Sequence, residues 1–528
     1  MSWVAVSPRT PNQASSPALG ANRRAVVIGV PALVALAYAL GHLNWYLGTP
    51  LGRVPVLDEH ENLYLAAQIY GGHLPHEPLY RAPGYALLLA GARAAGVPAS
   101  GLFAAALLIG ALLHSIGAGL VASISDRWFG IGAGVLAGML FALDPVLVHY
   151  ATQALDSTFS MTLFLAGLAF LSAAVKVPGR TGFWAGAGMC WAAATLVRPN
   201  YLLVWLALPV LALFQPLAAA ARVRMAAVAL ASALLFVASA AWQRSATGTA
   251  AFLPWQGAYN LWASNRPGAN GRYYSQRVSL PPELARLNPA RAESIILYSK
   301  ETNGGPTDIA SMNTHWRQRF TDEVSAHPLA WARLMAKKAY ALLNNWEQYN
   351  NKTYAFHKAL SPWLRWNPLC WGVLLILGVA GGARLLAENP RAGAALAVVT
   401  AACTASIILF FVSARFRLPL VGINAALAGG ALASPRFWQN WAPGRKAALA
   451  ACAALAALLA FSNFGNVSDP ATFVQDHVLL ARAAYTVGDD EMALAEARAA
   501  LQLQPRHPDA LAIERAASAP MPPKGSTP

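Results

Sequence analysis

The sequence is poor in charged residues, and above all in acidic ones. Only 12% of its 528 residues are charged, and 23 Asp and Glu stand against 39 Lys and Arg. Soluble globular domains carry about 25% charge, whereas 56% of this chain is hydrophobic, so we expect a membrane protein. The positive excess does not predict nucleic-acid binding, because most basic residues lie in short gaps between apolar runs, where they suit anionic lipid headgroups.

Cysteine is scarce as well. The four cysteines lie in or beside apolar runs without a CxxC pair: Cys190, Cys370, Cys403 and Cys452. This excludes a disulfide framework and a thiolate metal site. A divalent metal could bind four other side chains, His60, His73, His76 and Glu77, but their spacing matches no familiar ligand motif. No metal or other cofactor is therefore indicated.

Long apolar runs dominate what is present, and about 20 apolar residues suffice for a helix to cross a bilayer. They predict an all-α polytopic membrane protein with about eleven spans, approximately 26–47, 100–123, 129–143, 157–175, 181–197, 200–216, 225–243, 365–386, 393–412, 417–433 and 447–464. Residues 84–96 are apolar but too few to cross, so we expect a juxtamembrane or re-entrant helix there.

Basic residues mark alternate gaps between the spans, which predicts a cytoplasmic N-terminus. The expected parts are a disordered N-terminus (1–24), a first transmembrane module (25–243) with an outer loop at 48–99, a helical cap (244–364), a second module (365–464) and a tail (465–528). Cap and tail would lie outside, in the periplasm if the membrane is a bacterial inner membrane. An odd number of spans is needed for this arrangement.

The tail has the pattern of a helical hairpin. Gly488, Ala493, Ala497 and Pro505 resemble the turn, crossing and end positions of a tetratricopeptide repeat. One repeat cannot bury its own faces, so we expect residues 470–515 to pack on the cap or on a protein partner. A hairpin without a partner is the alternative.

Acidic residues gather just after the first span, at Asp58, Glu59 and Glu61, and one more, Asp156, precedes the fourth span. A carboxylate at the membrane surface can act as a general base. Alternatively, the first group is only the charged start of a helix and Asp156 only an N-cap.

Arginines lie in the same outer loops: Arg81, Arg198, Arg415 and Arg417. Positive charge there opposes the positive-inside bias, and an anionic ligand such as a lipid-linked phosphate explains it. The alternatives are an interfacial anchor for Arg81 and a helix-end charge for Arg198. The nearby triplet Asn351-Lys352-Thr353 matches a glycosylation sequon, which is too common to carry weight.

Taken in order, these motifs resemble the GT-C membrane glycosyltransferases, in particular the bacterial branch related to protein mannosyltransferases and aminoarabinose transferases. The resemblance covers about residues 25–435 and includes Leu79-Tyr80-x-x-Pro83, Arg198-Pro199-Asn200, residues 257–271, and His327-Pro328 followed by Lys337 and Glu347. It implies a GT-C-type bundle, a lipid-phosphate sugar donor and chemistry on the non-cytoplasmic face. Arg81 departs from the lysine that relatives often carry near this position.

By this resemblance the chain would move a sugar from a polyprenyl-phosphate donor to a hydroxyl of a lipid, glycan or protein acceptor, with inversion. Three residues are then expected to be catalytic, Asp58, Glu59 and Asp156, and four to bind the donor phosphate, Arg81, Arg198, Arg415 and Arg417. The expected substrate contacts are Glu61, Tyr80, Tyr85, His149, Tyr150, Asn260 and Asn265. A transporter or lipid flippase, or a non-catalytic assembly subunit, remains the alternative. The absence of an inverted repeat speaks against transport.

Overall fold

The computed structural model describes residues 17–177, 179–213, 218–274, 276–281, 283–284, 287–305 and 308–518. Most of the expected disordered N-terminus and the last ten residues lie outside these ranges. The described residues form helices and no strands. The chain is an all-α polytopic membrane protein, as the hydropathy pattern predicts.

Each predicted span contains a helix of the membrane bundle. The bundle consists of α1 (Pro17–Leu47), α5 (Leu102–Phe129), α6 (Ile131–Ala142), α8 (Asp156–Lys176), α9 (Thr181–Val197), α10 (Leu202–Leu213), α11 (Ala218–Thr247), α17 (Trp371–Glu388), α18 (Pro390–Ile408), α19 (Ala414–Ala433) and α20 (Pro443–Phe461). Among the described residues, eight helices are long and apolar enough to cross a membrane, or nine if α6 and α7 (Pro145–Ala151), bent by 57°, form one span. Eleven crossings therefore stay a prediction.

Helix α19 lies at the centre of the bundle and packs against α5, α6, α8 and α17. Glycines permit this close packing, because a Cβ at Gly381 of α17 would lie 1.9 Å from the Leu427 carbonyl oxygen, and one at Gly429 would lie 2.4 Å from that of Ala133. At the periphery, Leu230 of α11 is 66% exposed, as expected of a side chain that faces lipid. The central helix thereby fixes the residues of its first turn, Arg415 and Arg417.

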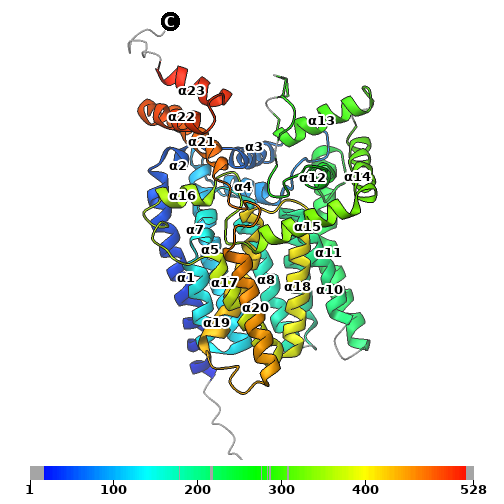
Figure 1. Cartoon of the computed structure of the whole chain (residues 1–528). Coiled ribbons are helices and arrows are strands. Elements are labelled where there is room, and N and C mark those ends of the chain that lie inside the picture. The colour runs from blue at the N-terminus through cyan, green and yellow to red at the C-terminus, as the bar shows by residue number, and fades with distance from the viewer. Residues whose placement is uncertain are drawn as a thin grey trace, which may run out of the picture.

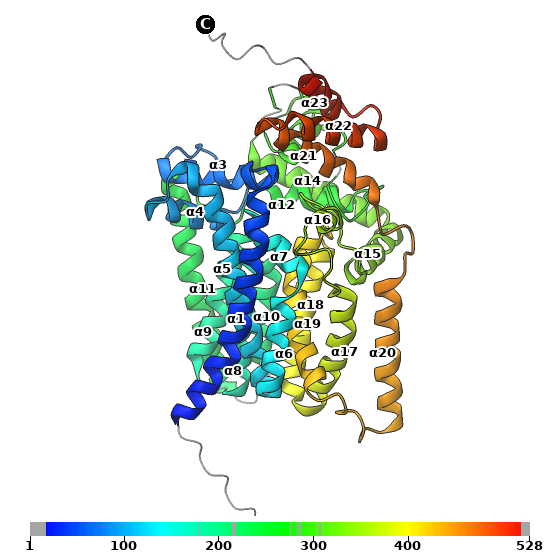
Figure 2. The same cartoon turned by 90° about the vertical axis from the view of Figure 1, so that its left-hand side faces the viewer.

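The remaining helices gather at one end of the bundle, which we call the cap end (Figures 1 and 2). They are α2 (Pro50–Arg53), α3 (Asp58–Gly71), α4 (Gly84–Ala94), α12 (Gln256–Asn265), α13 (Pro289–Glu301), α14 (Ile309–Ala326), α15 (Pro328–Leu343), α16 (Tyr354–Leu360) and the tail, with the 3₁₀ turns η1 (Ala99–Gly101), η2 (Pro199–Tyr201) and η3 (Pro470–Thr472). The apolar segment at 84–96 is the short helix α4, beside α3. Short connections such as α5–α6 and α17–α18 lie at the opposite end.

The tail contains one helix more than the expected hairpin: α21 (Phe473–Thr486), α22 (Asp490–Leu503) and α23 (Pro508–Ser518). Gly488 adopts φ +82° between α21 and α22, a conformation that favours glycine. Leu479 and Leu480 of α21 are buried in one cluster with Leu51 and Phe356. The tail therefore packs on α2 and α16, so it docks on the chain's own cap end.

Candidate active site

Asp58 is the first residue of α3, and its carboxylate turns inward. The preceding residue, Leu57, has φ +49° and provides no side-chain cap. This left-handed conformation is strained for a leucine and lets the chain enter the helix abruptly. Asp58 is consequently only 8% exposed, so it is neither a solvated helix start nor an N-cap.

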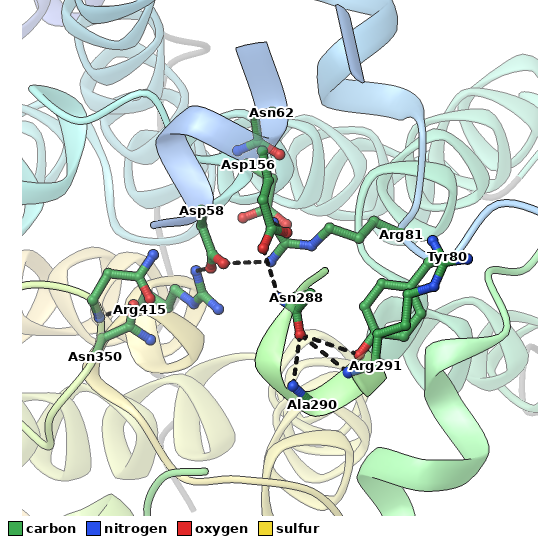
Figure 3. A network of polar contacts seen from close by, with 12 residues as sticks. Asp58, Asn62, Tyr80, Arg81, Asp156, Asn288, Ala290, Arg291, Asn350 and Arg415 are labelled. Atoms are coloured by element: carbon green, nitrogen blue, oxygen red, sulfur yellow. Dashed lines mark hydrogen bonds and ion pairs between the residues drawn. The ribbon is translucent and has the colours of Figure 1, made fainter. Parts of the chain in front are cut away.

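Two arginines hold the Asp58 carboxylate from opposite sides (Figure 3). Arg81 Nη2 lies 2.7 Å from Oδ1, and Arg415 Nη1 lies 2.6 Å from Oδ2. Arg81 also contacts Glu61 Oε2 at 2.8 Å. Burial alone would raise the pKa of Asp58, but the two guanidinium groups outweigh it and hold this pKa well below its ordinary value. The carboxylate is thus ionised at neutral pH.

A second acid–arginine pair adjoins this clamp. Asp156 begins α8 without capping it, since the N-cap is Leu155, and its Oδ2 accepts a hydrogen bond from Arg198 Nε at 3.0 Å. Arg198 Nη1 also donates to the Arg415 carbonyl at 3.4 Å. The end of α9 and the starts of α8 and α19 are thereby joined.

Glu59, the neighbour of Asp58, is bound entirely within the protein. Lys352 Nζ lies 2.8 Å from Glu59 Oε2, and both side chains are 1% exposed. Lys352 also donates to Tyr46 Oη at 2.6 Å, and Glu59 accepts the backbone N–H groups of Val56 and Ala154. Glu59 therefore ties α1, α3, the α7–α8 connection and residue 352 together.

The tail reaches the same segment through Asp476. This residue is fully buried, and its Oδ1 accepts the Thr353 N–H at 2.8 Å and pairs with His357 Nε2 at 3.2 Å. Lys352 is the neighbour of Thr353 in the chain, and it pairs with Glu59. Glu59 in turn directly follows Asp58. A continuous set of polar contacts therefore connects the tail to the first turn of α3.

Arg417 does not join the Asp58 clamp. It is 3% exposed, forms an ion pair with Glu347, and donates to the carbonyls of Leu342 at 3.1 Å and Asn344 at 2.5 Å. The sequence placed it two residues from Arg415 on the same helix, but successive helical residues point in different directions. The structure thus assigns Arg417 to internal packing.

Glu61 and Tyr80 both meet Asn288, the N-cap of α13. Asn288 Nδ2 donates to Glu61 Oε1 at 2.8 Å, and Tyr80 Oη lies 3.4 Å from Asn288 Oδ1 (Figure 3). The cap is therefore fastened onto α3 directly beside Arg81. Nothing in the sequence indicated Asn288, which is 227 residues from its partner.

The other expected substrate contacts are five side chains that make no hydrogen bond to the clamp in the described part of the chain. Tyr85, His149 and Tyr150 are at most 4% exposed. Asn265 donates to the Leu409 carbonyl and accepts from Lys338 Nζ at 3.0 Å. Asn260 is half-buried, and its side chain has no hydrogen-bond partner among the described residues.

The described residues contain no group of three His, Cys, Asp or Glu side chains placed to hold a metal ion. Of the four side chains considered for a metal, Glu77 pairs with Arg291 at 2.5 Å.

No known protein-family profile and no curated protein sequence matches the chain. Among solved structures, it is similar to the apo oligosaccharyltransferase of Archaeoglobus fulgidus, with 14% identity, a TM-score of 0.47 and coverage of 94% of this chain and 60% of that one. It is also similar to ArnT from Cupriavidus metallidurans bound to undecaprenyl phosphate, with 16% identity, a TM-score of 0.32 and coverage of 78% and 81%. The chain thus spans about 60% of the length of the first structure. Likeness at this level assigns no activity to it.

Proposed function

We propose that the chain is an integral-membrane glycosyltransferase that moves a sugar from a polyprenyl-phosphate donor to an acceptor hydroxyl at the cap end. The observation that carries this proposal is the clamp of Asp58 between Arg81 and Arg415. It combines, in one partly open site, a carboxylate that can take a proton with two guanidinium groups that can neutralise a phosphate.

In this proposal Arg81 and Arg415 bind the donor phosphate. A guanidinium shared with a phosphate holds a carboxylate less strongly, so donor binding raises the pKa of Asp58 and makes it a better base. The acceptor oxygen then attacks the anomeric carbon, its proton passes to Asp58, and the sugar–phosphate bond breaks with its electron pair on the phosphate. The arginines stabilise that leaving group. A single displacement inverts the anomeric centre.

The remaining charged residues are proposed to position the site. Arg198 holds Asp156 and the Arg415 carbonyl, which keeps Asp156 beside the clamp as the second acid. Glu59 and Arg417 are engaged within the protein on all sides described above, so we propose that they orient α3 and α19 and do not touch substrate.

We further propose a bacterial inner membrane as the location, with the cap end in the periplasm. Arg127, Arg384 and Lys446 lie near the connections at the opposite end, and such residues favour the cytoplasmic side. A transporter would use charges along a path through the bundle, whereas the acid–arginine clamp is built from first turns and loops at one end. This placement favours the transferase over transport.

The test is mass spectrometry of envelope glycolipids and glycoproteins from a deletion strain rescued with wild type, Asp58→Asn or the exposed control Asp322→Asn. We expect one defined sugar to disappear in the deletion and to return with wild type and the control only. With purified protein, Asp58→Asn should lower the release of polyprenyl phosphate by about 10²–10⁴-fold, the usual contribution of a general base. Full rescue by Asp58→Asn would refute the assignment.

A further inference from the structure

The cap contains a cavity that no residue of the Asp58 clamp lines. It has a volume of about 110 Å³ and lies between α12, the loop after it, α13 and the α18–α19 connection. Helices α12 and α13 are in the upper right of Figure 1. Aromatic and arginine side chains line the cavity: Tyr259, Arg266, Tyr273, Tyr274, Arg277 and Phe411. Pockets for drug-sized ligands hold about 300–1,000 Å³, so this one is suited to a single ring.

The cavity has one cation without a counterion. Glu293 is fully buried and accepts from Tyr274 Oη and from Arg277 Nε at 3.1 Å, so that acid and Arg277 neutralise each other. Among the described residues the Arg266 side chain makes one hydrogen bond, to the Pro267 carbonyl at 3.1 Å, and no carboxylate lies within ion-pair distance of it. An anionic group would therefore find an available guanidinium here.

The cavity also has a buried donor without a partner. Tyr259 is 1% exposed, and its Oη lies near Arg277 and Glu293 but forms no hydrogen bond of good geometry with any described residue. A buried hydroxyl left unpaired is unfavourable, and a ligand hydroxyl or carboxylate would satisfy it. The rings of Tyr273, Tyr274 and Phe411 offer flat apolar surfaces to the C–H face of a sugar.

Two chain segments connect the lining of the cavity to the Asp58 clamp. The Val412 N–H, next to Phe411, donates to the Gly271 carbonyl at 3.1 Å, and Arg415 follows three residues later. On the other side, Tyr259 and Tyr80 belong to one aromatic cluster, and Tyr80 precedes Arg81. A ligand in the cavity thus lies next to the elements that hold both phosphate-binding arginines.

We infer that this cavity binds the acceptor, and that the acceptor carries a sugar ring with a negative charge, from a carboxylate or a phosphate. The inference rests on the proposed transferase function, because it assigns the cavity to the second substrate. Arg266 would bind the charge, Tyr259 would pair with a ring substituent, and the aromatic side chains would cover the ring.

The experiment is saturation-transfer difference NMR on the detergent-purified full-length chain with D-glucuronate and D-glucose as probes. We expect glucuronate to bind at least tenfold more tightly than glucose, and Arg266→Gln and Tyr259→Phe to remove this preference. The control Arg365→Gln, in an arginine outside the cavity, should preserve it. Equal binding of the two sugars, or glucuronate binding unchanged in Arg266→Gln, would overturn the inference.

Inorganic phosphate separates the two sources of charge. If phosphate displaces glucuronate in the NMR experiment, the site accepts a phosphorylated ring. If phosphate does not displace glucuronate, the site prefers a carboxylate. Either result agrees with an anionic acceptor. Binding of polyprenyl phosphate is measured in the same preparations. Arg266→Gln should leave polyprenyl phosphate binding intact, and Arg415→Gln should weaken it. If the wild type does not bind polyprenyl phosphate, the proposed transferase function alone is refuted. If the wild type does not prefer glucuronate to glucose, the acceptor site alone is refuted.

Discussion

Glu59 and Asp58 are adjacent acids with different partners, and replacing Glu59 tests the proposal that their roles differ. Glu59 and Lys352 are both 1% exposed and 2.8 Å apart. Glu59→Gln leaves the Lys352 ammonium buried, with Tyr46 Oη as its remaining partner. Removing one member of a buried ion pair costs about 3–5 kcal/mol, so we expect a loss of that size in the free energy of unfolding.

The loss should be recovered when both charges are removed together. In Glu59→Gln/Lys352→Met no unpaired charge stays buried, and replacing both members of such a pair is often close to neutral. We therefore expect the double variant to be more stable than Glu59→Gln by about 2 kcal/mol or more. Denaturant titration in mixed micelles measures these differences, and exposed Glu491→Gln serves as the control, with a change within about 0.5 kcal/mol.

Activity decides between a positioning and a catalytic role. If Glu59 positions α3, turnover per folded molecule in the double variant should stay far above that of Asp58→Asn. The reasoning is refuted if Glu59→Gln is as stable as the Glu491→Gln control and nevertheless abolishes turnover. Glu59 would then be a catalytic carboxylate, as the sequence pattern first indicated.

Two further predictions concern the tail and pH. Asp476→Ala should weaken tail docking by about 1.5–3 kcal/mol, the contribution of hydrogen bonds to a charged group. Limited proteolysis should then cut residues 462–472 sooner in this variant than in the control Asp509→Ala, which changes an exposed residue. Equal cutting of the two variants would contradict the docking role. Burial lowers the pKa of Lys338 to about 7, whereas the unfolded chain keeps that proton to about pH 10. Between pH 7 and pH 10 the unfolded state therefore binds more protons than the folded state, and the free energy of unfolding should rise with pH by at most about 4–5 kcal/mol. Lys338→Met should remove this rise, whereas Lys337→Met, at an exposed position, should keep it.

The sequence predicted the helices well because their causes are local. A run of about 20 apolar residues is sufficient to specify a membrane helix. Each of the eleven predicted segments contains a helix, and eight helices of the described residues are long and apolar enough to cross a membrane. The grouping of Asp58 with Arg81, and of Asp156 with Arg198, also follows from local order, because outer loops of a bundle meet at one end. Helix α9 (Thr181–Val197) has the bounds of its predicted span.

The partners that decide each charged residue's role are distant in sequence. Lys352 is 293 residues from Glu59, and the surrounding Asn-Lys-Thr triplet gave no reason to expect a buried lysine, which is rare without a partner. Arg415 is 357 residues from Asp58, and Asp476 lies in a tail that looked like an appendage. Such pairings follow from packing and have no short-range signature.

Exposure then separates arginines that the sequence treats alike. The side chains of Arg81 and Arg415 are 22% and 14% exposed, whereas that of Arg417 is 3% exposed. A phosphate can reach a guanidinium only where some of its surface is open, and Arg417 already has Glu347 and two carbonyl groups as acceptors. Because Arg81 and Arg415 both bind the carboxylate of Asp58, a donor phosphate that takes their charge also releases that carboxylate. Donor binding and activation of the base are therefore one event in the proposed mechanism, and an acceptor should react only after the donor is in place.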